Sequence, residues 1–218
     1  MKDSVPPKSS EQECAWYVVQ PITFLMRAQE QLQFGTLSSV DSYDPSKNSI
    51  SNAWKLFLFG NGSPTQHLAL LTGIPTQVDV ISMKTMQQFD TNDQMASLAY
   101  DAIQSTIASP RVQRQVWLHN STQRLGYAAS WTCENDLHII FPNVSVPIGQ
   151  NVLEQKLELY RDIQSVFCGK SARLEKQFGC AGPFWGRTYF FRYRNRPITF
   201  IYEVFSPVLT EYLGPVLV

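Results

Sequence analysis

Two charged side chains interrupt segments of this chain that otherwise read as apolar β-strands. Alternate residues of a strand share a face, and one such face reads Val112, Arg114, Val116 and Leu118. Near the C-terminus, a second face reads Ile201, Glu203 and Phe205. A charge on a core-facing side is unfavourable unless it is paired or meets a ligand. The pattern therefore predicts either an Arg114–Glu203 ion pair or a site for a small molecule with a carboxylate at one end and a hydroxyl at the other.

Composition favours a globular domain over a disordered or nucleic-acid-binding chain. The chain has 218 residues, of which 44% are hydrophobic and 12% aromatic, enough to form a core. Lys+Arg and Asp+Glu both number 18, whereas a nucleic-acid surface needs a basic excess. We interpret a local basic stretch as a strand face and a hairpin tip; it contains Arg187, Arg192, Arg194 and Arg196. We expect no nucleic-acid partner.

Cysteine spacing indicates neither a metal site nor a disulfide framework. The cysteines are Cys14, Cys133, Cys168 and Cys180, and none lies at the close spacing of zinc ligands. Cys168 and Cys180 could approach each other, but free thiols are expected in a reducing compartment. Residues 1–10 are polar, and no stretch reaches about 18 consecutive apolar residues. We therefore expect no metal, no secretory signal, no membrane span and a cytosol-like compartment.

The N-terminal half predicts short elements between loops. Residues 1–12 are interpreted as a flexible tail and residues 13–218 as a single domain. Apolar residues in 13–34 predict a short strand or helix, and the Ser-, Asp- and Asn-rich segment 35–52 predicts a loop. A helix is predicted over 64–72, with Pro64 at its first position, a capping box from Ser63 and Gln66, and Gly73 as its C-cap. A strand is predicted at 78–81.

The C-terminal half predicts antiparallel hairpins and separate helices, which together indicate an α+β fold. Strands are expected at 111–118 and 125–132, joined by a turn at 119–123, and at 187–193 and 198–205, joined by a tight turn. One helix is expected near 94–105. Another is expected over 150–167, where apolar residues recur on one helical face: Leu153, Leu157, Tyr160, Ile163 and Phe167. Residues 179–186, rich in Gly, Pro and aromatic residues, are expected to form a loop.

Several motifs follow one another between residues 54 and 207. Leu56-Phe57-Leu58 precedes a turn and the helix over 64–72, and Arg114-Gln115-Val116-Trp117-Leu118 precedes a turn and Tyr127-Ala128-Ala129-Ser130-Trp131. Pro147-Ile148-Gly149 comes next, followed by Trp185-Gly186-Arg187, Arg196-Pro197-Ile198 and Glu203-Val204-Phe205-Ser206-Pro207. In this order the motifs resemble the chorismate lyase family, in its plastid and cyanobacterial-like branch, which converts chorismate into 4-hydroxybenzoate and pyruvate.

The resemblance implies a single antiparallel sheet of about six strands, with flanking helices that cover an enclosed ligand cavity. It implies that Arg114 binds the substrate carboxylate through two parallel N–H bonds, and that Glu203 acts as general acid or hydrogen-bond partner. Main-chain groups of Ile148 and Gly149 would complete the carboxylate site. Pro64 has no N–H where the family uses a backbone amide, so either a neighbour such as Thr65 replaces it or the site is altered.

Arg187 has two interpretations, a substrate-binding residue at the cavity rim or an exposed residue at the start of a strand. The resemblance also implies a monomer without a cofactor, whose partners are chorismate and 4-hydroxybenzoate. The product would supply the ring of a prenylated quinone such as plastoquinone or ubiquinone, in the cytoplasm or the plastid stroma. The alternatives are a non-catalytic module that binds or senses small aromatic acids, and a lyase with a different substrate.

Overall fold

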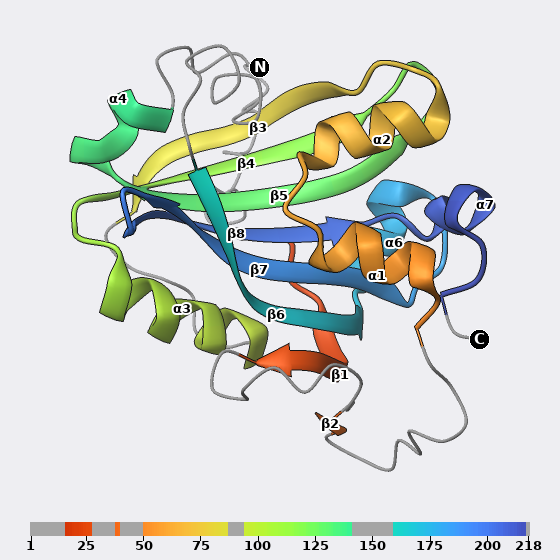
Figure 1. Cartoon of the computed structure of the whole chain (residues 1–218), viewed down its shortest axis with the longest axis horizontal. Helices are drawn as coiled ribbons and strands as arrows, with labels where there is room; N and C mark the ends of the chain where they lie inside the picture. The colour runs from red at the N-terminus through yellow and green to blue at the C-terminus, as the bar shows by residue number, and fades with distance from the viewer. Residues whose placement is uncertain (1–15, 28–37, 40–49, 87–93, 141–158, 217–218) are drawn as a thin grey trace, which may run out of the picture.

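The strands of this protein form one antiparallel sheet. The computed structural model describes residues 16–27, 38–39, 50–86, 94–140 and 159–216 (Figure 1). Within these ranges the sheet has eight strands in the order β2-β1-β6-β7-β8-β5-β4-β3. They are β1 (Gln20–Arg27), β2 (Ser38–Ser39), β3 (Gln77–Met86), β4 (Arg111–His119), β5 (Arg124–Cys133), β6 (Leu159–Lys170), β7 (Phe184–Tyr193) and β8 (Arg196–Phe205). The α+β prediction is confirmed, but the sheet is wider than the expected six strands because β1, β2 and β6 extend it beyond β7.

Short helices flank this sheet. They are α1 (Asn52–Phe59), α2 (Pro64–Thr72), α3 (Gln94–Thr106), α4 (Leu137–Ile140), α6 (Ala172–Phe178) and α7 (Thr210–Leu213), with 3-10 turns η1 (Glu134–Asp136) and η2 (Pro207–Leu209). In the described ranges, no helix is both long and apolar enough to cross a membrane. The same ranges contain no cluster of His, Cys, Asp and Glu side chains that would hold a metal ion.

Both predicted hairpins are present. β4 pairs with β5, and β7 pairs with β8, each pair antiparallel and adjacent in the sheet. Arg194 and Asn195 have φ values of 47° and 63° at the tip of the second hairpin. Positive φ at both central residues is typical of the tight turn whose twist matches the flanking strands. The two hairpins meet where β5 pairs with β8, so Arg114 and Glu203 lie on neighbouring hairpins of one sheet.

The prediction of a helix over 150–167 is wrong for the part that the structure describes. Residues 159–167 belong to β6, which pairs with β1 on one side and β7 on the other, whereas residues 150–158 lie outside the described ranges. The register between β6 and β7 shifts between Ile163 and Ser165, as in a β-bulge. Such a shift changes which residues share a face, so apolar residues at helical spacing, such as Ile163 and Phe167, can also occur in a strand.

Other boundaries differ by smaller amounts. The segment 13–34 contains β1, and the expected loop at 35–52 contains β2 before α1 begins at Asn52. The strand predicted at 78–81 extends over the whole of β3, and the loop predicted at 179–186 ends where β7 begins at Phe184.

The helix predicted over 64–72 is confirmed as α2, but its predicted capping box is wrong. The side chain of Ser63 makes no capping hydrogen bond; instead its Oγ lies 2.8 Å from Oγ1 of Thr65. Gly73 ends the helix with φ 69°, and its N–H donates to the carbonyl of Ala69. A left-handed residue at this position favours glycine because a Cβ would be strained there.

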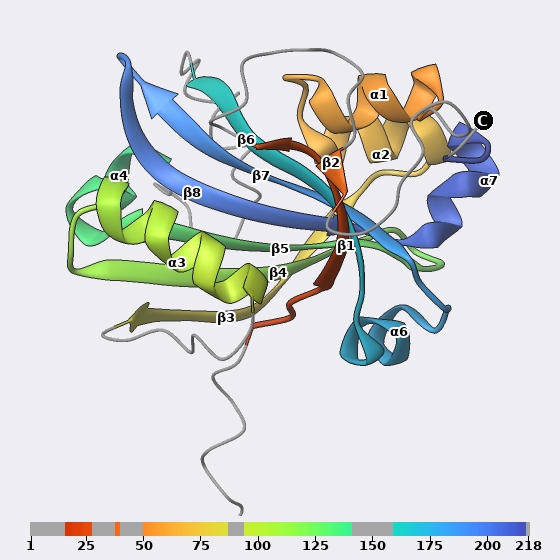
Figure 2. The ribbon, with the colours of Figure 1, turned by 90° about the horizontal axis from the view of Figure 1, so that it is seen from below.

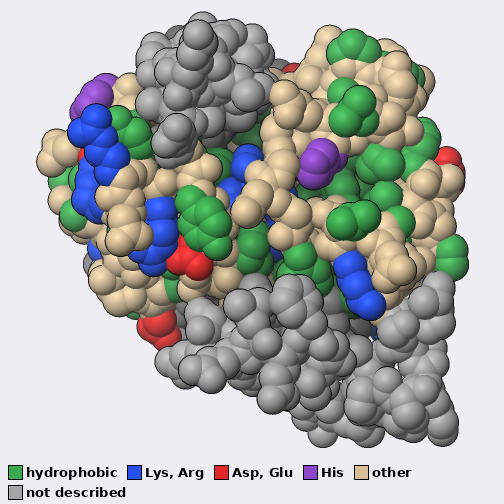
Figure 3. All heavy atoms as spheres, viewed as in Figure 1, with side chains coloured by type: hydrophobic (Ala, Val, Ile, Leu, Met, Phe, Trp, Pro, Cys, Tyr) green, Lys and Arg blue, Asp and Glu red, His purple; other side chains and the backbone are tan. Residues whose placement is uncertain are grey.

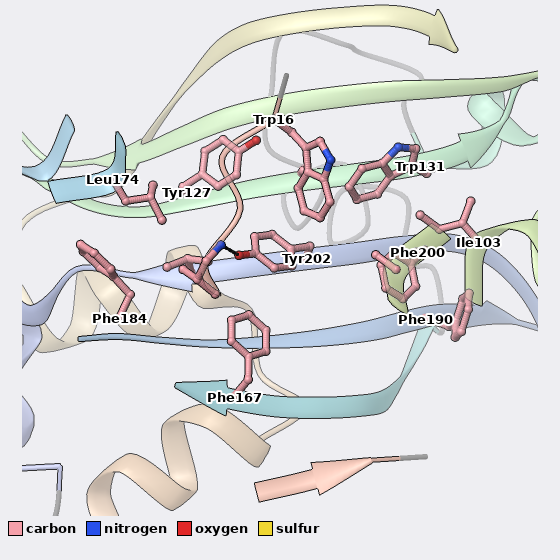
Figure 4. Packing of buried hydrophobic residues seen from close by; sticks show 14 of the residues in the cluster. Trp16, Ile103, Tyr127, Trp131, Phe167, Leu174, Phe184, Phe190, Phe200 and Tyr202 are labelled. Carbon is pink, nitrogen blue, oxygen red and sulfur yellow. Dashed lines mark hydrogen bonds between the residues drawn. The ribbon is translucent and has the colours of Figure 1, made fainter. Parts of the chain in front are cut away.

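The two faces of the sheet are covered by different elements (Figures 1 and 2). One apolar cluster joins α3 and α6 to the sheet through Ile103, Trp131, Leu174 and Tyr202, among others. Figure 4 shows Trp16 between Trp131 and Tyr202 in this cluster, with ring centroids 4.9 Å and 4.7 Å away. The opposite cluster joins α1 and α2 to β4, β5 and β8 through Trp54, Leu68, Val116 and Phe205, among others. The charged strand residues Arg114 and Glu203 occupy this second face.

Candidate functional site

A pocket lies on the sheet face that α1 and α2 cover. Its volume is about 60 Å³, and it is partly open to the surface. Its walls come from α2 and from β3 to β8: Ser63, Pro64, Thr65, Val78, Arg114, Val116, Leu118, Ala128, Ser130, Arg161, Tyr189, Phe191, Ile201 and Glu203. Figure 3 shows this side of the molecule, where Lys and Arg side chains near the centre of the view are set back between other atoms and further ones lie at the surface. The described residues thus form a pocket; they do not show the enclosed cavity expected from sequence.

Arg114 contributes a buried cation to the pocket. It lies in the middle of β4, and only 3% of its surface is exposed. Burial lowers the pKa of Arg114 to about 10, so its guanidinium is still charged at neutral pH. A guanidinium binds a carboxylate with two parallel N–H bonds that fix both position and angle. Arg114 is therefore suited to hold an acidic group of a ligand.

Glu203 contributes a carboxylate whose oxygens are both held by neighbours on β7. Nε of Arg187 donates to Oε2 at 2.9 Å, and the hydroxyl of Tyr189 donates to Oε1 at 2.7 Å. Burial, and next the charge of Glu203, raises the pKa of Tyr189, so its phenol keeps the proton that it donates. Glu203 thus forms an ion pair with Arg187, while Arg114 lines the same pocket.

Arg187 lies behind the pocket wall and not at its rim. Its surface is 0% exposed, so the interpretation as an exposed strand-start residue is wrong. Its Nη1 donates to the carbonyls of Phe57, Leu58 and Gly60 at 3.2, 3.0 and 3.1 Å, at the end of α1. The last carbonyls of a helix have no partner within the helix and carry partial negative charge. Arg187 therefore satisfies the end of α1 and holds Glu203 at the same time, but does not line the pocket.

Arg161 is a pocket residue that the sequence prediction missed. It lies on β6, with its guanidinium carbon 4.7 Å from the ring centroid of Phe191 and 5.7 Å from that of Tyr189. Its Nη1 donates to the carbonyl of Asn61, in the loop between α1 and α2. Because the sequence predicts a helix over 150–167, the strand alternation that includes Arg161 is not part of that prediction. Read as a strand, Leu159, Arg161 and Ile163 share one face, which is the same signal that identified Arg114.

The remaining predicted site residues have different positions. Thr65 lines the pocket at the start of α2, beside Pro64. Ile148 and Gly149 lie outside the described residues. In the motif Tyr127-Ala128-Ala129-Ser130-Trp131, Ala128 and Ser130 line the pocket, whereas Ala129 is buried in the cluster on the opposite face of the sheet.

The fold and pocket define a class of α+β proteins with a pocket on one face of an antiparallel sheet, lined by charged and apolar residues. A family described as chorismate pyruvate-lyase Rv2949c-like matches residues 58–213. The uncharacterized protein ycf21 of Cyanophora paradoxa is 35% identical over 161 residues, covering 73% of this chain and 80% of that protein. The uncharacterized protein ycf21 of Porphyra purpurea is 34% identical over 165 residues, covering 75% of this chain and 86% of that protein. The chain belongs to the Rv2949c-like chorismate pyruvate-lyase family.

Among solved structures, the effector domain of PhnF from Mycobacterium smegmatis is similar with a TM-score of 0.46 and 12% sequence identity. The match covers 69% of this chain and 92% of that domain.

Proposed function

We propose that this protein is a chorismate lyase that converts chorismate into 4-hydroxybenzoate and pyruvate. The observation that carries the proposal is that Arg114 and Glu203, from different hairpins, line one pocket. Part of the pocket wall is apolar and includes Val116, Leu118, Ala128 and Ile201. Such a pocket matches a ring that carries a carboxylate at one end and a hydroxyl at the other. The membership in a chorismate pyruvate-lyase family supports the same assignment.

The reaction needs orientation and one proton transfer. The ring carbon that bears the hydroxyl loses its hydrogen as a proton, the C–O bond to the enolpyruvyl group breaks, and the ring becomes aromatic. The departing enolpyruvate takes up a proton on its methylene carbon and becomes pyruvate, so atoms and charge balance. Because aromatisation favours the products, the protein mainly positions the substrate and assists this proton movement. No cofactor is required by this scheme.

The side chains divide this work. Arg114 holds the ring carboxylate and so fixes the position of the ring. Glu203 is the carboxylate among the described pocket residues, and both of its oxygens already act as acceptors toward Arg187 and Tyr189. We assign it the hydrogen bond to the substrate hydroxyl and the transfer of the ring proton to the leaving enolpyruvyl group. Arg187 and Tyr189 act through Glu203 as positioning residues.

A chorismate assay with chromatographic identification of the aromatic product tests this function. The protein should form 4-hydroxybenzoate above the spontaneous rate, and Glu203→Gln should lower the rate by about 100-fold or more. Arg114→Gln should weaken carboxylate binding. Arg192→Gln is the matched control, since its guanidinium pairs with Asp162 and does not line the pocket. The absence of any catalysed product in the wild-type protein would refute the proposal.

One observation also supports the alternative, a module that binds small aromatic acids without converting them. Glu203 accepts hydrogen bonds from two fixed donors, and this arrangement suits holding a ligand hydroxyl as well as moving a proton. A thermal shift with 4-hydroxybenzoate in a protein that leaves chorismate unchanged would favour this alternative. Turnover of isochorismate, or a 3-hydroxybenzoate product, would instead indicate a lyase with different specificity.

The proposed reaction also suggests a cellular role. A 4-hydroxybenzoate product would supply the ring of a prenylated quinone, and we place this step in the cytoplasm or the plastid stroma. A monomer is sufficient, because residues of a single chain form the described pocket.

A further inference from the structure

We propose that Arg161 forms a second anion subsite in the pocket, so that the pocket recognises a dicarboxylate. On the basis of the proposed function, Arg114 holds the ring carboxylate and Arg161 holds the carboxylate of the enolpyruvyl group. The lyase product 4-hydroxybenzoate carries a single carboxylate and engages Arg114 alone. Arg161 is thereby the residue that distinguishes the substrate from this product.

Among the described residues, Arg161 lacks the kind of acidic partner that Arg187, Arg192 and Arg196 have. Arg187, Arg192 and Arg196 contact carboxylates at 2.9, 2.7 and 2.7 Å respectively. Arg161 forms no ion pair with a described residue, and its buried Nε has no hydrogen-bond partner there. A buried donor left without an acceptor is unfavourable, so an anionic ligand at this position would gain a charge-assisted hydrogen bond.

The surroundings of Arg161 hold its guanidinium in place. It lies over the rings of Phe191 and Tyr189, and its Nη1 donates to the carbonyl of Asn61. A guanidinium resting on aromatic rings is stabilised by cation–π attraction and keeps N–H groups for a planar anion. The same Tyr189 donates to Glu203, so the second cation and the proposed proton-transfer carboxylate are linked through one side chain.

The strand order separates the two cations. Arg161 lies on β6 and Arg114 on β4, with β7, β8 and β5 between them. Both nevertheless line the same pocket, together with Glu203 from the intervening β8. A ligand that reaches both arginines must therefore carry two acidic groups at separate positions. Chorismate, with one carboxylate on the ring and one on the enolpyruvyl ether, meets this requirement.

Calorimetric binding of two matched aromatic ligands tests the assignment. One is 3-(1-carboxyvinyloxy)benzoate, a dicarboxylate; the other is 3-(isopropenyloxy)benzoate, in which a methyl group replaces the second carboxylate. Both rings are already aromatic, so the proposed reaction cannot occur and binding is measured without turnover. The wild-type protein should bind the dicarboxylate about ten-fold more tightly or better, as expected for a hydrogen bond between charged groups. Arg161→Gln should remove this preference and leave the affinity for the monocarboxylate within about two-fold.

Further variants separate the second subsite from a general loss of charge or folding. Arg161→Lys should recover part of the preference, because it keeps the charge but not the planar fork. Arg114→Gln should weaken both ligands, and Arg192→Gln should change neither. Equal affinity of the wild-type protein for the two ligands, binding of neither, or an equal loss of both in a folded Arg161→Gln variant would overturn the assignment.

The chorismate assay keeps this inference distinct from the proposed function. Catalysis without a dicarboxylate preference would leave the lyase assignment in place and remove the role of Arg161. A preference that depends on Arg161, in a protein without lyase activity, would establish the subsite and reject the enzyme.

Discussion

Arg187 joins Glu203 on β8 to the carbonyl end of α1. Its Nε donates to Oε2 of Glu203 at 2.9 Å, and its Nη1 lies 3.0 Å from the carbonyl of Leu58. One buried guanidinium therefore fixes both the pocket carboxylate and the helix that leads into the loop before α2. Since Ser63, Pro64 and Thr65 line the pocket just after that loop, Arg187 couples two of its walls.

Removal of Arg187 should therefore affect folding as well as activity. Arg187→Met leaves Glu203 buried without its cation, which costs about 3–5 kcal/mol for a buried pair. Urea denaturation measures this loss. Arg192→Met is the control, because its pair with Asp162 is partly exposed, and it should cost about 1 kcal/mol or less. The double variant Arg187→Met/Glu203→Gln should recover part of the stability but none of the activity. Equal losses of stability in Arg187→Met and Arg192→Met would contradict the role assigned to Arg187.

Tyr189→Phe should reduce catalysis more than it reduces substrate binding. It removes the donor to Oε1 of Glu203 and should cost roughly 1–3 kcal/mol of transition-state stabilisation, about 5- to 150-fold in kcat. Steady-state kinetics with chorismate measures kcat and KM separately. Tyr202→Phe is the matched control, since the Tyr202 hydroxyl accepts from the N–H of Val19 on the opposite face. An unchanged kcat in Tyr189→Phe would show that Glu203 does not need this donor.

Gly186→Ala should destabilise the hairpin that carries the site. A Cβ at Gly186 would collide with the carbonyl oxygen of Glu203 and the ring of Phe167. Because backbone atoms cannot move aside easily, we expect a loss of about 2–3 kcal/mol. At Gly126 on β5, the nearest atom to a Cβ would be the Val204 carbonyl oxygen at 3.3 Å, so Gly126→Ala should cost about 1 kcal/mol or less. Thermal unfolding of both variants compares the two losses of stability. A larger loss in Gly126→Ala than in Gly186→Ala would disprove the expected crowding at Gly186.

Cys168 should resist alkylation in the folded protein. It is a free cysteine, 7% exposed, and burial raises the pKa of its thiol to about 12. The thiolate is the reactive form, so iodoacetamide at pH 8 should label the more accessible Cys180 first and label Cys168 only after unfolding. Peptide mass spectrometry assigns the label to each residue. Rapid native labelling of Cys168 would contradict its burial.

The same shift predicts how stability changes at alkaline pH. The folded state keeps the Cys168 thiol protonated up to a pKa of about 12, above the ordinary value of 9.0. The unfolded chain therefore releases this proton at a lower pH than the folded protein does. The contribution of the buried thiol to the free energy of unfolding is complete below pH 9 and decreases as the pH rises toward 12. Cys168→Ser should lessen this decrease in urea-denaturation curves measured across the interval; identical pH dependence in both proteins would exclude the contribution.

Local patterns in the sequence determined the two hairpins, α2 with its glycine end, and the placement of Arg114 and Glu203 on one side of the sheet. These features follow from strand alternation, turn residues and helix ends, which involve neighbours along the chain. The tertiary structure decided the rest. Residues 159–170 became β6 because β1 and β7 pair with both of its edges. That pairing brought Arg161 into the pocket, and the approach of α1 buried Arg187 beside Glu203. Such contacts join segments far apart in the chain, and no periodicity within a single segment encodes them.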